Sequence, residues 1–314
     1  MRILVALGGN ALLRRNERPD ADIQQHHIED AVAALADILC DHEVIITHGN
    51  GPQVGMLAIE SATDSALTRP YPLDALVAQT QGMIGYWIAQ SIHNLLPQQN
   101  VVALLTQTVV DRNDPAFQTP TKFVGPTYSH RELSAIAKQH SWNMAADGDA
   151  WRRVVASPEP QAVVELPLIQ MLVDAKVIVV CAGGGGIPVE ALSNGRRTGV
   201  EAVVDKDFTA ALLAESLGAD RLLLLTDVSA VESDYGTPDA RRLRDTTPDE
   251  LRLLNFPAGS MRPKVEAACR FVDHTGNPAG IGSLLDATAI LNGHAGTTIR
   301  SRHHQIESAA QSCL

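Results

Sequence analysis

Three apolar runs in this chain each lead into a glycine-rich loop, and this repeated pattern constrains the fold more than any other feature. The runs are residues 3–7, followed by Gly8-Gly9-Asn10, residues 44–47, followed by His48-Gly49-Asn50-Gly51, and residues 177–180, followed closely by four glycines at 183–186. Each run predicts a buried strand whose carboxyl end enters a loop of bare backbone. Where such loops meet at one edge of a parallel sheet, their amides can bind an anion.

Strand patterns alternate with helix patterns along most of the chain. Helical periodicity is typical of residues 28–39, 74–96, 169–173, 207–217 and 263–272, and strand patterns occur at 101–106, 200–204, 222–226, near 281 and at 297–299. Thr247-Pro248-Asp249-Glu250 has the spacing of an N-cap, an N1 proline and a capping glutamate. The alternation predicts an α/β fold in which helices sandwich a mostly parallel sheet.

Residues 111–160 interrupt this alternation, because prolines and polar residues accumulate and long hydrophobic runs disappear. Ser129-His130-Arg131-Glu132 has capping-box spacing and predicts the start of a short helix. We interpret the segment as an inserted subdomain, or lid, on the main sheet. Residues 300–314 carry no strong pattern and predict a mobile tail.

Composition argues against several classes of protein. The 314 residues carry a formal net charge of −11 without a cluster of lysines and arginines, which disfavours nucleic acid as a partner. Apolar runs stay well short of the roughly 20 residues that span a bilayer, and Met1-Arg2 leads directly into a strand, so we expect neither a membrane span nor a signal peptide. The scattered Cys40, Cys181, Cys269 and Cys313 predict reduced thiols, and hence a cytoplasmic protein.

The glycine loops favour phosphate chemistry over dinucleotide binding. They match neither the Walker pattern nor the dinucleotide spacing with its following acid, which argues against a dehydrogenase. Four consecutive glycines at 183–186 have little use in a packed domain, so we favour close approach to a phosphate there. Gly82 and Gly85 interrupt a helical stretch at a cost of about 1 kcal/mol each, which indicates close packing against another helix or a partner subunit.

Lysines stand at three places suited to phosphoryl transfer, which needs positive charge around the moving group. Lys122 lies in the lid segment, Lys206 lies between Asp205 and Asp207, and Lys264 lies at a helix start. Each residue also has a simpler interpretation, since loop lysines are usually solvated and Asp207 can cap its helix. His48 is compatible with a ligand donor and equally with a hydrogen-bonded structural histidine.

These motifs together resemble the carbamate kinases of the amino acid kinase superfamily. The matching segments run in order from Arg2 to about Ile299 and include residues 6–11, 47–55, 80–86, Pro120-Thr121-Lys122, 151–158, 183–188, 201–207 and 259–264. The resemblance implies a three-layer α/β/α sandwich around a mostly parallel open sheet. It also implies one domain over 1–299, with an acceptor lobe at 1–175 that includes the lid and a nucleotide lobe at 176–299. It implies a homodimer that transfers a phosphoryl group reversibly between ATP and carbamate with Mg²⁺, often in the direction of ATP formation.

The resemblance also implies residue roles. Lys122, Lys206, Lys264, Asp205 and Asp207 would be catalytic. Phosphoryl group and acceptor would be held by Gly8, Gly9, Asn10, Gly49, Asn50 and Gly51 through amides, with help from Arg152. Nucleotide contacts would come from Gly183, Gly184, Gly185, Thr226, Asp227, Tyr235, Met261 and Pro263, and Mg²⁺ would be bound mainly through the nucleotide. Carbamate already carries a negative oxygen, so the reaction requires neither a nucleophilic side chain nor a general base.

The chain departs from the usual family pattern at three places. Asp147-Gly148-Asp149 stands where a glycine-arginine-glycine segment is usual, Asp227 replaces a glycine, and Arg262 replaces a small or apolar residue. The first departure leaves open another small carboxylate or phosphonate as acceptor. A nucleotide-binding homologue without turnover is a further alternative, although retention of all three lysines and both aspartates argues against it.

Overall fold

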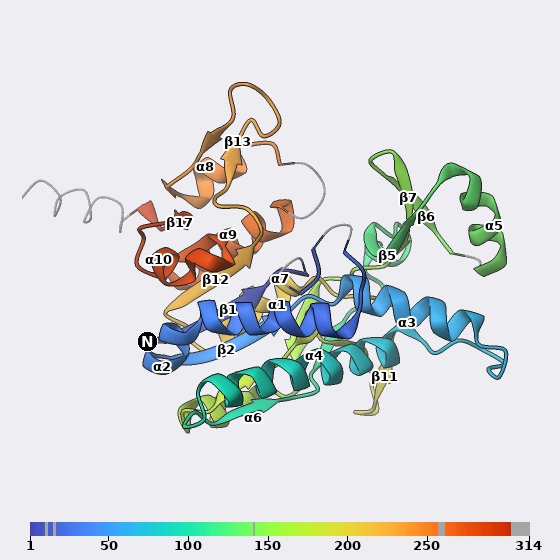
Figure 1. The fold of residues 1–314 in the computed structure, drawn as a ribbon, viewed down its shortest axis with the longest axis horizontal. Helices are drawn as coiled ribbons and strands as arrows, with labels where there is room; N and C mark the ends of the chain where they lie inside the picture. The colour runs from blue at the N-terminus through green and yellow to red at the C-terminus, as the bar shows by residue number, and fades with distance from the viewer. Residues whose placement is uncertain (10–11, 15–16, 141, 257–260, 303–314) are drawn as a thin grey trace, which may run out of the picture.

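The computed structural model describes residues 1–9, 12–14, 17–140, 142–256 and 261–302, without the side chains of 138–140. Its central feature is an eight-stranded sheet of order β15-β17-β16-β12-β1-β2-β9-β3 (Figure 1). The strands are β1 (Arg2–Leu7), β2 (Glu43–His48), β3 (Val101–Ala103), β9 (Ile178–Val180), β12 (Arg221–Thr226), β15 (Asp245–Thr246), β16 (Ala279–Ser283) and β17 (Thr297–Ile299). All neighbouring pairs are parallel except β16 and β17. The predicted mostly parallel sheet is confirmed.

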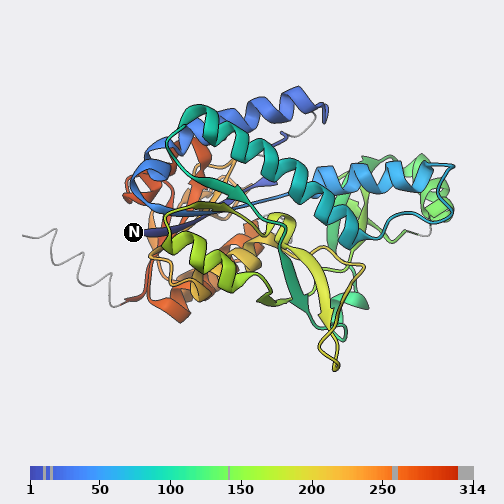
Figure 2. The same cartoon turned by 90° about the horizontal axis from the view of Figure 1, so that it is seen from below.

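Helices cover both faces of this sheet (Figure 2). One layer contains α1 (Ala21–Ala34), α2 (Ala36–Asp41), α4 (Leu73–Leu95) and α10 (Ala287–Leu291), and the other contains α6 (Leu166–Asp174), α7 (Lys206–Ser216) and α9 (Met261–Thr275). In β1, Ile3 and Val5 pack against the first layer, whereas Leu4 packs against the second. Burial on both faces explains why the strands are continuous apolar runs. The predicted three-layer sandwich is confirmed.

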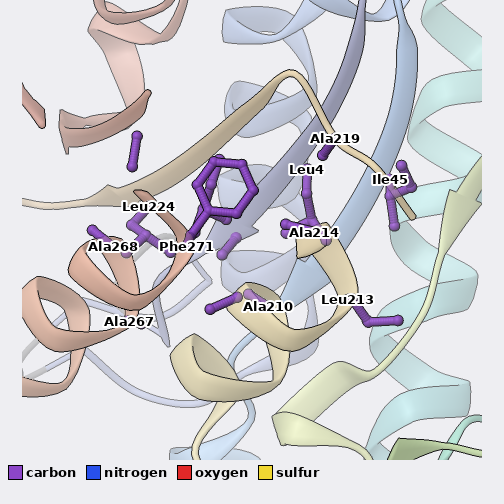
Figure 3. Close-up of a cluster of buried hydrophobic side chains, with 14 of the residues drawn as sticks. Leu4, Ile45, Ala210, Leu213, Ala214, Ala219, Leu224, Ala267, Ala268 and Phe271 are labelled. Atoms are coloured by element: carbon purple, nitrogen blue, oxygen red, sulfur yellow. The ribbon is translucent and has the colours of Figure 1, made fainter. Parts of the chain in front are cut away.

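The core beneath the second layer fixes the two helices that carry the predicted catalytic lysines 206 and 264. Phe271 of α9 is fully buried and lies among Ala210 and Leu213 of α7 and Leu4 and Leu224 of the sheet (Figure 3). Small alanines on both helices allow the helices to approach each other and the sheet closely. Each helix leads directly into a parallel strand of the main sheet, α7 into β12 and α9 into β16, so each runs back across the sheet and begins at its carboxyl edge. The core therefore holds both helix starts at the edge where the glycine loops lie.

A second sheet has the order β11-β10-β4-β8, and its strands β10 and β11 follow the glycine run directly. Its strands are β4 (Gln107–Val110), β8 (Pro160–Val163), β10 (Ile187–Ala191) and β11 (Arg197–Gly199). The strand predicted at 200–204 is wrong, because this stretch is irregular. Its alternating Val200, Ala202 and Val204 pack against Val110 and Ala156, so the apolar pattern reflects burial without a strand ladder.

A separate three-stranded antiparallel sheet forms within the segment predicted to be a lid. It contains β5 (Lys122–Tyr128), β6 (Met144–Asp147) and β7 (Ala150–Val155), with α5 (His130–His140) inserted between β5 and β6. Ser129 donates its NH and hydroxyl to Glu132, as the capping-box spacing predicted. We call residues 122–155 the three-stranded subdomain; it projects from the main body beside α3 (Gly51–Thr63) (Figure 1).

The remaining elements are short. They are β13 (Glu232–Ser233), β14 (Arg241–Arg242), α8 (Pro248–Arg252) and the 3₁₀ turns at Pro115–Phe117, Gly183–Gly185 and Leu284–Asp286. Thr247 and Glu250 form the predicted capping box of α8. Among the described residues, no helix is long and apolar enough to cross a membrane. The predicted mobility of the tail concerns mainly residues 303–314, which lie outside the described residues. The lobe boundary at 175 and the cytoplasmic location stay predictions.

Candidate active site

The glycine loops after β1 and β2 touch each other at the carboxyl edge of the main sheet. A Cβ on Gly49 would lie 2.9 Å from the backbone nitrogen of Gly9, so only glycine fits there. Gly8 donates its NH to Leu225 (2.8 Å), and Gly49 donates its NH to Leu7 (3.0 Å). Because these two amides extend the sheet, the arrangement gives no support to phosphate contacts through them.

Gly9 and Gly51 keep open space beside their backbones. A Cβ at either position would meet no atom of the described residues within 4 Å. Gly51 begins α3, and the first NH groups of a helix have no partner within the helix. Asn50 is buried at the N-cap and donates its side-chain amide to Thr80 Oγ1 (2.9 Å). Gly9, Asn50 and Gly51 therefore stay candidates for binding an anion, whereas Asn10 lies outside the described residues.

The four glycines at 183–186 are buried and pack against protein atoms. An added Cβ would lie 2.2 Å from His48 at Gly183 and 2.1 Å from Asn50 at Gly184. It would lie 2.5 Å from Val204 at Gly185 and 1.9 Å from Thr108 at Gly186. The last three also have φ between +65° and +90°, which favours glycine. Our expectation that packing has little use for such a run is wrong, since each neighbour excludes a side chain. This geometry gives no support to nucleotide contacts at Gly183–Gly185.

Two lysines share one buried carboxylate at the same edge of the sheet. Lys206 Nζ lies 2.5 Å from Asp207 Oδ1, and Lys264 Nζ lies 3.0 Å from Asp207 Oδ2. The three residues are between 3 and 7% exposed. Lys206 and Asp207 start α7 and Lys264 lies in the first turn of α9, so two separate helix starts bring the three groups together.

The pKa values within this cluster follow from burial and mutual charge. Burial and the charge of Lys264 outweigh the attraction of Asp207 and lower the pKa of Lys206 to about 8. Burial also acts to lower the pKa of Lys264, but the Asp207 carboxylate raises it above its ordinary value. Burial acts to raise the pKa of Asp207, yet the two ammonium groups hold it below its usual range. Asp207 is therefore ionised at neutral pH, and the cluster is poised to accept more negative charge.

Lys122 reaches this region from the three-stranded subdomain. Its Nζ pairs with Asp205, whose other oxygen caps α7 by accepting the NH of Asp207 (2.9 Å). The side chain of Lys122 is 27% exposed, unlike the buried lysines of the body. Asp205 thus links Lys122 to the start of the helix that carries Lys206, and the five residues predicted to be catalytic lie in one connected group.

Neighbouring arginines on β7 face opposite sides of the three-stranded sheet, because side chains alternate along a strand. Arg153 pairs in register with Val124, on the side of Lys122, and Arg152 pairs with Asp147 (3.0 Å) and lies near the Phe123 ring. The arrangement therefore gives no support to the predicted contact of Arg152 with substrate. The sequence did not single out Arg153 as a functional residue, because the pattern alone does not show which of two adjacent arginines faces the side of Lys122.

His48 has a structural role in this arrangement. It is 1% exposed, its Nδ1 lies 3.0 Å from the Gly49 carbonyl oxygen, and its ring occupies the space that a Gly183 side chain would need. Burial lowers its pKa to about 4, so the ring is neutral at physiological pH. This answers the question that the sequence left open.

Comparison with known proteins places the chain in a family. The model of the amino acid kinase family matches residues 1–283. The chain belongs to the amino acid kinase family. Within this family it is 48% identical to a carbamate kinase of Rhizobium meliloti (strain 1021), over 98% of this chain and 95% of the relative. It is 47% identical to a carbamate kinase of Haemophilus influenzae, over 96% of this chain and 97% of that protein.

Solved structures agree with this placement. Carbamate kinase from Giardia lamblia bound to AMP-PNP superposes with a TM-score of 0.86 at 39% identity, covering 95% of this chain and 98% of the other. The T. acidophilum isopentenyl phosphate kinase product complex, at 17% identity and a TM-score of 0.55 over 96% of this chain and all of the other, shares the fold alone. Together with the family model, these likenesses confirm the predicted amino acid kinase fold.

The other residues predicted for the nucleotide side lie at the end of β12, at the start of α9 and in an exposed loop. Thr226 ends β12 and donates its hydroxyl to Asp227 (3.1 Å), and the charge of Asp227 helps to raise the pKa of Lys264. Met261 and Pro263 lie in the first turn of α9, beside Lys264 in sequence. Tyr235 is 68% exposed in the loop between β13 and β14 and is not part of the buried cluster.

Proposed function

We propose that this protein is a carbamate kinase that transfers a phosphoryl group reversibly between carbamoyl phosphate and ADP. The observation that carries the proposal is the buried cluster of Lys206, Lys264 and Asp207 beside the glycine loops. A pair of ammonium groups on one carboxylate at the carboxyl edge of a parallel sheet is suited to phosphate oxygens. The full-length similarity to proteins named carbamate kinase supports carbamate as the acceptor.

In the proposed mechanism, the fixed charges of the protein do most of the work. Lys206 and Lys264 neutralise oxygens of the moving phosphoryl group, and Asp207 holds both amines in place before substrate arrives. Lys122 adds positive charge from the three-stranded subdomain, which acts as the lid. The NH groups of Gly9 and of the first turn of α3 complete the anion site. In the direction of ATP consumption, an anionic oxygen of carbamate forms a bond to the γ-phosphorus of ATP while the bond from that phosphorus to the bridging oxygen breaks and ADP leaves. The rate therefore comes from positioning and electrostatics.

Nucleotide and metal bind together in this proposal. Thr226, Met261 and Pro263 lie close to the buried cluster of Lys206, Lys264 and Asp207, and we propose that they border the nucleotide. Among the described residues, no group of three or more His, Cys, Asp or Glu side chains could hold a metal ion. Asp205 and Asp207 are already paired with lysines. We therefore propose that Mg²⁺ arrives on the phosphates of the nucleotide, where it supplies further charge neutralisation.

The proposal is tested by ATP formation from ADP, Mg²⁺ and carbamoyl phosphate. We expect robust synthesis by the wild-type protein. Folded protein that binds ADP but makes no ATP from carbamoyl phosphate would contradict carbamate as acceptor. In that case ATP-dependent phosphorylation of small carboxylates and phosphonates tests the acceptor alternative, which the Asp147-Gly148-Asp149 segment motivates.

We further propose that the protein forms a homodimer through the edge of the main sheet beside α4. A Cβ on Gly85 would lie 2.9 Å from the Cβ of Ala103 in β3, whereas a Cβ on Gly82 would meet nothing within 4 Å in the part of the chain that the structure describes. Tyr86, one turn after Gly82, and Leu105, just beyond β3, are each 56% exposed. A second copy would cover these apolar side chains. Analytical ultracentrifugation should give a dimer that Tyr86→Arg weakens, and a wild-type monomer at micromolar concentration would contradict the proposal.

A further inference from the structure

Glu201 joins three segments of the chain that are far apart in sequence. Its Oε2 accepts the NH of Leu73, the first residue of α4 (2.9 Å), and its Oε1 lies 3.6 Å from a guanidinium nitrogen of Arg153 in β7. A carboxylate is stabilised at a helix N-terminus by the unpaired NH groups and the helix dipole. Glu201 is therefore held on the main body and presents its second oxygen to the three-stranded subdomain.

Arg153 is held in a matching way on the subdomain. Its side chain is 14% exposed, and the guanidinium lies 4.5 Å from the centre of the Trp142 ring. A guanidinium stacked on an aromatic face has little freedom to turn. Glu201 is the carboxylate that the main body presents to it, so the pair joins one oriented group on each side of the boundary.

The segment 201–205 contacts the subdomain at two points, Glu201 with Arg153 and Asp205 with Lys122. Between them, Val203 donates its NH to the carbonyl oxygen of Ala156, the residue that directly follows β7 (3.0 Å). The next two residues, Lys206 and Asp207, belong to the buried cluster. Movement of the subdomain away from this segment would therefore separate Lys122 from the cluster.

We propose that Arg153 and Glu201 are positioning residues that hold the three-stranded subdomain so that the Lys122 ammonium group stays at the active site. This rests on the proposed phosphoryl transfer and adds two residues to it that touch neither the reacting atoms nor the substrate. The pair acts on the acceptor side through Lys122. The nucleotide side, formed by the start of α9 and the end of β12, does not depend on it.

Kinetics with a double-mutant cycle test the route of action. We expect Arg153→Gln and Glu201→Gln each to lower kcat/KM for carbamoyl phosphate about tenfold, with KM for ADP within about twofold of wild type. In a Lys122→Ala background the same substitutions should cost less than about twofold, because the group they position is gone. Arg153→Lys should restore part of the loss. Arg131→Gln, an exposed arginine of α5, is the matched control.

Hydrogen exchange of the full-length protein provides a readout that needs no turnover. Arg153→Gln and Glu201→Gln should speed exchange of amides in residues 122–155 and leave the strands of the main sheet unchanged. Unchanged exchange in the subdomain, or losses that add fully to that of Lys122→Ala, would overturn the proposal. Absence of ATP formation by the wild-type protein would overturn the proposed function instead, and the exchange data would still decide whether the pair fastens the subdomain.

Discussion

Positive charge at the candidate site comes from two regions built in different ways. Lys206 and Lys264 are buried, share Asp207 and stand on helices that the core around Phe271 fixes to the sheet. Lys122 is partly exposed, pairs with Asp205 and stands on a separate small sheet. The difference indicates that the main body holds two positive charges in fixed positions, whereas the position of the third depends on contact between the subdomain and the main body.

The largest effect is expected from Asp207→Asn, which tests whether Lys206 and Lys264 of the buried cluster depend on their shared carboxylate. The substitution leaves two buried ammonium groups without their shared carboxylate, which should lower the free energy of unfolding by about 3–5 kcal/mol at neutral pH. ATP formation should fall by about 10³-fold or more. Chemical denaturation and the coupled ATP assay measure both. Asp245→Asn, which alters a surface pair with Arg300, is the control, and unchanged stability of Asp207→Asn would contradict a unified cluster.

Lys122→Ala should separate catalysis from stability. Loss of a partly exposed ion pair should change the free energy of unfolding by less than about 1 kcal/mol. The same change should lower kcat/KM for carbamoyl phosphate about 10²-fold, because a charge at the phosphoryl group is lost. Activity that survives the substitution would mean that the body alone supplies the necessary charge.

Gly55→Ala should disturb the docking of the subdomain without touching any charge. A Cβ on Gly55 of α3 would lie 1.9 Å from the Gly125 Cα of β5, so the two elements must move apart. We expect a loss of about tenfold in kcat/KM, of the size seen when reacting groups are slightly misplaced. A crystal structure or hydrogen exchange of the variant should locate the change at β5. Wild-type kinetics in this variant would break the proposed link between docking and rate.

The smallest effect should appear in the pH dependence of kcat/KM, which reports on the charge of Lys206 in the buried cluster. With a pKa of about 8, Lys206 is half charged at pH 8 and loses its positive charge as the pH rises further. The kcat/KM for carbamoyl phosphate should therefore be about half its plateau near pH 8 and fall above it. Lys206→Arg keeps its charge and should move this alkaline limb to higher pH. A limb that stays in place would assign the titration to another group.

Sequence reasoning reached the parts of the fold that local patterns determine. The buried strands, the caps of α5 and α8 and the mostly parallel sheet follow from periodicity and short-range hydrogen bonding. The three lysines could be chosen because phosphoryl transfer restricts the useful residue types. Their grouping around Asp205 and Asp207 depends on how α7, α9 and β5 pack, which a single sequence does not contain.

The expectations that the structure does not support share a physical cause, because each depends on what a residue meets in space. The glycines at 183–186 are required by His48, Asn50, Val204 and Thr108, which are distant in sequence. Arg152 and Arg153 differ only in the face of β7 that they occupy. The amides of Gly8 and Gly49 are taken by neighbouring strands, and the stretch 200–204 is apolar because it is buried, although it forms no strand.

The depressed pKa of Lys206 has a consequence for the energetics of substrate binding. Burial and the charge of Lys264 keep the proton affinity of this amine low, and a phosphate dianion placed beside it would raise that affinity. Binding near pH 8 would then be accompanied by uptake of a fraction of a proton from solvent. The heat of binding would accordingly depend on the ionisation enthalpy of the buffer. Part of the apparent affinity for phosphate would come from protonation of Lys206, so the affinity would fall as the proton concentration of the solvent falls.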